Sequence, residues 1–364
     1  MRDMSYQMNR LPFVLARGGL LIALIMISAC GAMTQKDEHW VWPLPPEEPR
    51  LKYVESIHSS QDVKPQSAFD SFKQLVGGMA QDVSLVKPYG VAAFGKIIYV
   101  TDTILGKLLV FDRGRKTFKV FGNEGAGRLD KPIGVAVDRL GLVYVTDSHQ
   151  SRVIVYDAQG NYLRAMGGPK RLTRPTGITV NPANGHVYVV NTGTLDSRHH
   201  AVSVFDAQGR YLFDIGKRGA DKGRFNFPTN ICSDANGHVY VVDTGNFRVQ
   251  IFDADGKYLD SFGTVGTGLG SFARPKGIAV DSEGHIYVID SAFNNVQVFD
   301  QDKRLLLFAG TMGKGAGEFW LPAGMWIDDS DRIYIADQYN RRIQIWQFLR
   351  HNLPQQSKAG SEKI

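Results

Sequence analysis

Five aspartates and one asparagine recur along the chain at matching positions, where each closes a short apolar run. They are Asp102, Asp147, Asn191, Asp243, Asp290 and Asp337. A catalytic pair of carboxylates needs unlike surroundings that push the two pKa values apart. A residue that is repeated in every unit is more typical of a side chain that accepts hydrogen bonds from loop N–H groups. The repetition therefore predicts a structural role for these acids.

Three histidines, His186, His238 and His285, have side chains that could bind a metal. Each follows an Asn-Gly or Glu-Gly pair and opens its own apolar run. The ligand nitrogens of a zinc site lie about 2 Å from the ion, and equivalent turns of separate units do not bring three side chains so close. We therefore expect no metal and no cofactor.

Other catalytic patterns are missing from the sequence. There is no Gly-x-Ser-x-Gly, no His-Glu-x-x-His, and no Gly-Lys-Ser/Thr after glycine-rich stretches such as 263–270. The two cysteines, Cys30 and Cys232, provide neither a zinc spacing nor a disulfide framework. Cys232 falls within an apolar run, which predicts a small buried residue.

Four apolar runs between residues 275 and 310 read GIAV, IYVID, VQVFD and LLLFAG, with turns between them. Four strands of this length form an antiparallel meander. Glycine stands two residues after the first proline of the meander or, in one copy, Asn230, which predicts positive φ at this position. The same text starts again at six prolines, so the fold is a repeat array: Pro88, Pro132, Pro175, Pro228, Pro275 and Pro322.

The repeat, P-x-G-I-A-V-D, then I-Y-V-x-D, then R-V-x-V-F-D, then a strand ending in F-G, resembles that of NHL-repeat propellers over residues 88–349. The resemblance implies an all-β, six-bladed β-propeller with four-stranded antiparallel blades around a central channel. Six first-strand positions would face this channel and are poor metal ligands: Ala92, Ala136, Thr179, Cys232, Ala279 and Trp326.

The domain order follows from the breaks in this pattern. The sixth copy has three strands, because the text after Leu349 is a polar tail over 350–364, and the orphan apolar run at 51–57 is predicted to supply the fourth. This strand would seal the ring and remove its open edges. The propeller thus covers 51–349, with an insertion at 58–87 in which the apolar spacing of 67–76 predicts one short accessory helix.

Residues 1–29 are predicted to be a lipoprotein signal peptide. Three arginines precede an uncharged, mostly apolar run from Gly18 to Ala29 that is too short to span a bilayer. Residues 27–30, Ile-Ser-Ala-Cys, resemble the lipobox of bacterial lipoproteins, which implies lipidation of Cys30 and, with Gly31 next, an outer-membrane location. An ordinary secretory signal or a short anchor is the alternative. Residues 30–50 are predicted to form a Pro-rich tether.

A formal net charge of +6 is too small to indicate nucleic-acid binding by itself. Bases nevertheless gather in loops that share one face of such propellers: Lys87, Lys131, Arg174 and Arg274 precede repeat prolines, and Lys107, Arg152, Arg248 and Arg342 start or precede third strands. A longer loop in the third copy adds Asp196, Arg198, His199 and His200, and His149 lies in the matching loop of the second copy. Pairing of the bases with the repeated acids, and a merely tolerated loop insertion, stay open as alternatives.

We expect a monomeric, membrane-anchored and non-enzymatic binding or scaffold module of the cell envelope, on the periplasmic or cell-surface side. Its partner would be a protein, a peptide or an anionic glycan on the basic face, and no nucleic acid is expected. The alternative is a propeller enzyme, a lyase or lactonase-like hydrolase, with a site at the channel mouth.

Overall fold

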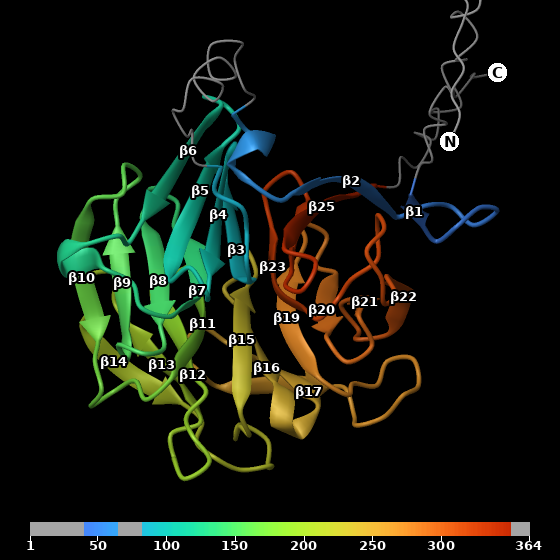
Figure 1. Ribbon diagram of the computed structural model, residues 1–364. Helices are drawn as coiled ribbons and strands as arrows, with labels where there is room; N and C mark the ends of the chain where they lie inside the picture. The colour runs from blue at the N-terminus through green and yellow to red at the C-terminus, as the bar shows by residue number, and fades with distance from the viewer. Residues whose placement is uncertain (1–39, 65–81, 351–364) are drawn as a thin grey trace, which may run out of the picture. The chain divides into compact units, whose positions relative to one another are not determined.

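The computed structural model describes residues 40–64 and 82–350, which form six antiparallel sheets arranged in a ring (Figure 1). The innermost strands of neighbouring sheets contact one another all the way around the ring. The six-bladed propeller expected from the repeat is therefore confirmed. The predicted signal peptide and the predicted helix at 67–76 lie outside the described residues.

Each blade takes its strands in chain order from the channel outward, except that two N-terminal strands complete blade 6. Blade 1 consists of β3 (Pro88–Phe94), β4 (Ile97–Asp102), β5 (Lys107–Asp112) and β6 (Thr117–Phe121). Blade 2 consists of β7 (Pro132–Val137), β8 (Val143–Asp147), β9 (Arg152–Tyr156) and β10 (Tyr162–Gly167). Blade 3 consists of β11 (Pro175–Val180), β12 (Val187–Asn191), β13 (Ala201–Phe205) and β14 (Tyr211–Ile215).

The second half of the ring follows the same plan. Blade 4 consists of β15 (Pro228–Ser233), β16 (Val239–Asp243), β17 (Arg248–Phe252) and β18 (Tyr258–Phe262). Blade 5 consists of β19 (Pro275–Val280), β20 (Ile286–Asp290), β21 (Asn295–Phe299) and β22 (Leu305–Ala309). Blade 6 consists of β23 (Pro322–Ile327), β24 (Arg332–Asp337), β25 (Arg342–Phe348), β2 (Leu51–Ile57) and β1 (Val41–Trp42). The helices of the described residues are three 3-10 turns: η1 (Ser60–Asp62), η2 (Gly125–Gly127) and η3 (Thr244–Asn246).

The burial of the strands explains their sequences. The second and third strands lie between two neighbouring blades, so they are buried on both faces and read as continuous Val, Ile and Tyr runs. The fourth strands of blades 1 to 5 form the outer edges of their sheets, and exposed residues alternate with partly buried ones along them, as in β14 and β22. The aromatic residues of the repeat fill the space between sheets, because Tyr99, Phe111 and Trp346 are almost fully buried.

Blade 6 is closed by the N-terminal strand, as predicted. Strand β2 pairs antiparallel with β25, with Leu51 opposite Phe348 and Tyr53 opposite Trp346, and Figure 1 shows the blue strand beside the red one. The sheet also extends further than expected. Strand β1 pairs with β2, and the Trp42 ring stacks on Trp346 with 4.4 Å between centroids. The upstream segment is therefore not tether alone, since Val41 and Trp42 belong to the sheet.

The repeated glycines have a reason different from the one expected. None of them has positive φ, and neither does Asn230. They are required because the innermost strands of adjacent blades approach closely around the channel. A Cβ added to Gly90 would lie 2.5 Å from the carbonyl oxygen of Ile133 in the next blade, a distance that no side chain tolerates.

Hydroxyl groups also join neighbouring blades at this level of the ring. Thr101 of blade 1 donates to the Ile133 carbonyl of blade 2 at 2.6 Å, and Thr146 of blade 2 donates to the Thr176 carbonyl of blade 3 at 2.6 Å. Each of these buried hydrogen bonds joins the second strand of one blade to the first strand of the next blade.

Strand direction defines two faces of the ring. On the proline face lie the repeat prolines, the loops between blades and the loops between second and third strands. On the hairpin face lie the tight turns between first and second and between third and fourth strands. The central channel runs along the axis of the ring from one face to the other.

Candidate functional site

The centre of the ring contains a cavity of about 570 Å³. Its walls are mainly the apolar side chains of the first strands, including Val91, Ile178, Ile231 and Met325. This size and lining are typical of small-molecule pockets.

The six positions expected to face the channel divide into two groups. Ala92 and Ala136 are fully buried and do not line the cavity, so the expectation is wrong for them. Thr179, Cys232, Ala279 and Trp326 do line it. Strand alternation does not separate the two groups, because all six residues have the same register, each opposite the repeated tyrosine of its second strand. Trp326 packs against the two hydrophobic clusters that contain Ala92 and Ala136.

Cys232 and Trp326 are the two unusual side chains of the cavity wall. Cys232 as a residue is partly exposed rather than fully buried. Desolvation of its thiol nevertheless raises the thiol pKa, so the thiol stays neutral. Trp326 takes the place of a small residue and packs against three hydrophobic clusters, which lie between blades 6 and 1, blades 1 and 2, and blades 2 and 3. Its indole Nε1 is buried without a hydrogen-bond partner.

Carboxylates surround the cavity mouth on the hairpin face. In each case an aspartate at the end of a first strand accepts hydrogen bonds from turn N–H groups and from the repeated tyrosine of the second strand. The pairs of Tyr hydroxyl and Asp carboxylate are Tyr144 with Asp138, Tyr240 with Asp234, Tyr287 with Asp281, and Tyr334 with Asp328. Blade 1 has Phe94 at this position, and the hydroxyl of its tyrosine, Tyr99, has no partner.

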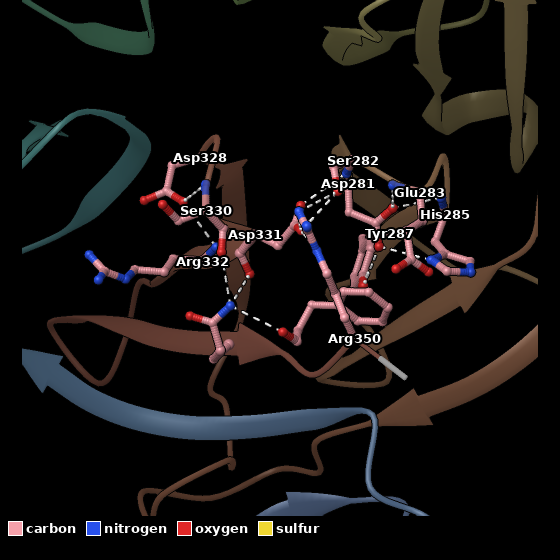
Figure 2. A network of polar contacts seen from close by, with 12 residues as sticks. Asp281, Ser282, Glu283, His285, Tyr287, Asp328, Ser330, Asp331, Arg332 and Arg350 are labelled. Atoms are coloured by element: carbon pink, nitrogen blue, oxygen red, sulfur yellow. Dashed lines mark hydrogen bonds and ion pairs between the residues drawn. The ribbon is translucent and has the colours of Figure 1, made fainter. Parts of the chain in front are cut away.

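Figure 2 shows how two such turns are joined. In blade 5, Nδ1 of His285 lies 2.9 Å from the Asp281 carboxylate, which accepts a hydrogen bond from the ring and raises the pKa of His285. In blade 6, Asp331 is 1% exposed, accepts from the backbone and hydroxyl of Ser282 in blade 5, and pairs with Arg350 at 2.6 Å. Burial alone would raise the pKa of Asp331, but the Ser282 and Arg350 contacts outweigh it and lower this pKa.

Two of the three histidines, His238 and His285, form local pairs within the fold, whereas Nδ1 of His186 is buried without a hydrogen-bond partner. His238 pairs with Asp234 as His285 pairs with Asp281, and each pair lies within one turn of its own blade. The described residues contain no group of three or more His, Cys, Asp or Glu side chains that could hold a metal ion.

The repeated acids on the proline face accept loop N–H groups, as predicted. Asp102 accepts from Val86 and Lys87 of the loop entering its blade and from Ile104 and Leu105 of the loop after its own strand. Asn191 accepts from the corresponding backbone of blade 3. Asp102 thereby ties two loops together, whereas, among the described residues, the Asn191 side chain bonds only to the loop that enters its blade.

The bases that start the third strands support these loops. Arg342 is the clearest case, because its side chain is 7% exposed, pairs with Asp337 at 2.9 Å and donates to three loop carbonyls. Arg248 repeats this arrangement with Asp243. Arg152 and Lys107 donate to loop carbonyls without pairing with the acid. These contacts favour the alternative in which the bases pair within the fold, so Arg248 and Arg342 are unsuited to contact a ligand.

The longer loop of blade 3 lies on the proline face, and its residues differ in exposure. His200 is fully buried, where burial lowers its pKa and its ring accepts from the Phe227 backbone, so it belongs to the core of the loop. Asp196, Arg198 and His199 are exposed. His149 of blade 2 is also exposed and lies 3.5 Å from Asp130.

A group of side chains at the channel mouth of the proline face was missed by the sequence analysis. Tyr89 and Lys276 stand between the proline and glycine of their repeats, where the other copies have smaller or uncharged residues. The Lys276 Nζ lies 5.5 Å from the centre of the Tyr89 ring. The sequence does show that the residue after the repeat proline varies from copy to copy. That Tyr89 and Lys276 meet near the axis of the ring follows only from the folded structure.

Family comparisons agree with this architecture. The ring, its central cavity and its repeated loop acids define a six-bladed β-propeller. A model described as DUF5128, 6-bladed beta-propeller, matches residues 220–303 and 282–353, and an NHL repeat model matches residues 129–156. The chain is therefore an NHL-type six-bladed β-propeller.

Solved structures with the same fold have diverse functions. A virginiamycin B lyase from Staphylococcus aureus has a TM-score of 0.55 at 13% identity, over 82% of this chain and 99% of that chain. A gluconolactonase from Xanthomonas campestris has a TM-score of 0.56 at 18% identity, over 82% and 98%. An auxiliary nutrient binding protein from Bacteroides thetaiotaomicron has a TM-score of 0.56 at 15% identity, over 73% and 70%. At these identities the likeness concerns the fold alone.

None of the helices among residues 40–64 and 82–350 has the length and apolar character needed to cross a membrane.

Proposed function

We propose that this protein is a non-enzymatic binding module of the cell envelope, anchored to the outer membrane through a lipid on Cys30. Its proline face would bind an anionic partner, either an acidic protein segment or an anionic glycan. The proposal combines the lipobox-like sequence at residues 27–30 with the distribution of charge over the propeller.

One observation carries the binding proposal: several cations of the proline face have no acidic partner. Lys131, Arg174, Arg198 and Arg274 are exposed, and no ion pair formed by the described residues involves them. Exposed cations of this kind contribute little individually, but together they attract and orient a partner of opposite charge.

The carboxylates of the hairpin face differ from these cations. The aspartates at the cavity mouth are each bound by turn N–H groups and a tyrosine hydroxyl, which supports a role in the fold rather than in acid–base catalysis. The alternative function, a propeller enzyme with a site at the channel mouth, would be supported by metal-dependent turnover of the purified protein.

The binding proposal is tested with a labelled oligoglutamate and the full chain in detergent, using fluorescence anisotropy. Lys131→Glu with Arg198→Glu should lower the affinity by about tenfold or more at low salt. The native affinity should fall as ionic strength rises, because exposed charges are screened beyond about 8–10 Å at physiological salt.

The matched control reverses two exposed cations of the hairpin face, Lys96→Glu with Arg139→Glu. It changes the net charge equally, so an equal loss of binding would show that only total charge matters. That result, or oligoglutamate binding that is indifferent to salt, would reject the proline face as the binding surface.

A further inference from the structure

The axis of the proline face brings together side chains from alternate blades. Tyr89 comes from blade 1, Arg174 from blade 3, and Arg274 and Lys276 from blade 5. Tyr89 and Lys276 meet across blade 6, where the equivalent residue is the small, buried Ala323. Arg174 and Arg274 act electrostatically on the Tyr89 phenol, and Arg274 also acts on Lys276, so the two arginines belong to the surroundings of this pair.

The electrostatics of this group are unusual. Burial together with Arg274 and Lys87 lowers the pKa of Lys276 to about 8. Burial raises the pKa of the Tyr89 phenol, while Arg174 and Arg274 pull it back. Tyr89 therefore remains a hydrogen-bond donor at neutral pH, and the charged groups acting on Lys276 are all cations.

Such a group is unfavourable for the fold when nothing is bound. A partly buried lysine surrounded by cations costs folding free energy while it is charged, which is the case below about pH 8. Lys303, another partly buried lysine, has a carboxylate beside it, since its Nζ lies 2.8 Å from Asp260. A lysine whose pKa is lowered at a channel mouth, with cations rather than acids acting on it, is typical of a binding site.

We infer that the axial mouth of the proline face, formed by Tyr89, Arg174, Arg274 and Lys276, is a binding site for a phosphate-type dianion. All four side chains are donors, and guanidinium groups and a lysine together match the several oxygens and the double charge of such a group. The inference deepens the proposed function and rests on it, since it names the chemical group that an anionic partner would place in the channel.

Inorganic phosphate is the probe, titrated into the full chain in detergent and followed by calorimetry. The native protein should bind phosphate more tightly than acetate, which has one charge. Lys276→Met should weaken phosphate binding by about 10- to 100-fold, the range expected when a charged hydrogen bond is lost. Tyr89→Phe keeps the ring and should produce a smaller loss.

Thermal stability gives a second measurement, which distinguishes a ligand-binding lysine from one that stabilises the fold. Lys276→Met removes an unfavourable charge and should raise the Tm by about 2–4 °C. The matched control, Lys303→Met, removes a lysine that has a carboxylate partner and should lower the Tm without changing phosphate affinity.

The two proposals fail separately. Absence of phosphate binding, equal affinity for acetate, unchanged affinity in Lys276→Met or a lower Tm in that variant would each overturn the axial site, while oligoglutamate binding through Lys131 and Arg198 could persist. Phosphate binding that depends on Lys276, with oligoglutamate binding indifferent to Lys131 and Arg198, would support the axial site and reject the wider face.

Discussion

At the scale of single residues, the same residue type has opposite roles on the proline face. Arg342 is buried, paired with Asp337 and bonded to loop carbonyls, whereas its neighbour Arg341 is exposed. A buried ion pair contributes mainly through the cost of breaking it, because the remaining charge loses its partner. Burial and pairing, rather than the charge itself, decide which arginines are available to a ligand.

This difference predicts unequal effects from equal substitutions. Arg342→Met should lower the free energy of unfolding by about 3–5 kcal/mol, because the fully buried Asp337 loses its cation. Arg341→Met removes the same charge at an exposed site and should change it by about 0.5 kcal/mol or less. Urea denaturation of both variants measures the difference, and similar values would mean that the Asp337–Arg342 pair does not stabilise the loop.

At the scale of elements, the ring depends on strands contributed by both ends of the described chain. Strand β25 has β24 on one side and β2 on the other, and β2 in turn is covered by β1. Without the N-terminal strands, β25 would present an open edge of N–H and C=O groups, which invites pairing between molecules. The stack of Trp42 on Trp346 adds a side-chain contact at the same seam.

Removing these strands should therefore damage the whole propeller. A chain that begins at residue 58 should aggregate or melt at a much lower temperature than one that begins at residue 40. Trp42→Ala, which keeps both strands, should cost an intermediate amount, about 1–3 kcal/mol of unfolding free energy. Light scattering and thermal denaturation provide the measurements; a monomer of unchanged Tm after truncation would contradict the closure.

At the scale of the whole molecule, the proline face has exposed cations such as Lys131 and Arg198 that form no ion pair among the described residues. The aspartates at the cavity mouth of the hairpin face accept hydrogen bonds from the tyrosines of their own blades. An arrangement of this kind orients an approaching anionic partner and accelerates its association. The membrane anchor, which concerns residues outside the described part of the chain, is a separate prediction.

The anchor is tested through Cys30. Cys30→Ser removes the thiol that would be acylated, so the protein should move from the membrane fraction to the soluble fraction or remain unprocessed. Cys232→Ser is the control, because this cysteine lies in the cavity wall and should leave membrane attachment unchanged. Fractionation and intact mass give the result; membrane attachment and mass unaffected by Cys30→Ser would reject lipidation.

The number and order of the blades could be predicted from the sequence alone. Their local signals recur six times, so an error in one copy is corrected by the others. The role of Asp102 as a loop acceptor and the closure by residues 51–57 follow from this repetition. The reason for the repeated glycines could not be predicted from the sequence. Glycine is required both where two blades approach closely and where φ is positive, and the sequence does not distinguish these two cases.

The functional assignment of the charged residues was decided by tertiary structure. Arg248 and Arg342 look like surface bases in the sequence, and only the folded loops supply the carbonyls and carboxylates that occupy them. Lys276 and Tyr89 are distant in the chain and meet only because the ring closes around its axis. Repetition encodes each blade locally, whereas the pairing, burial and free charge of a side chain depend on neighbours from other blades.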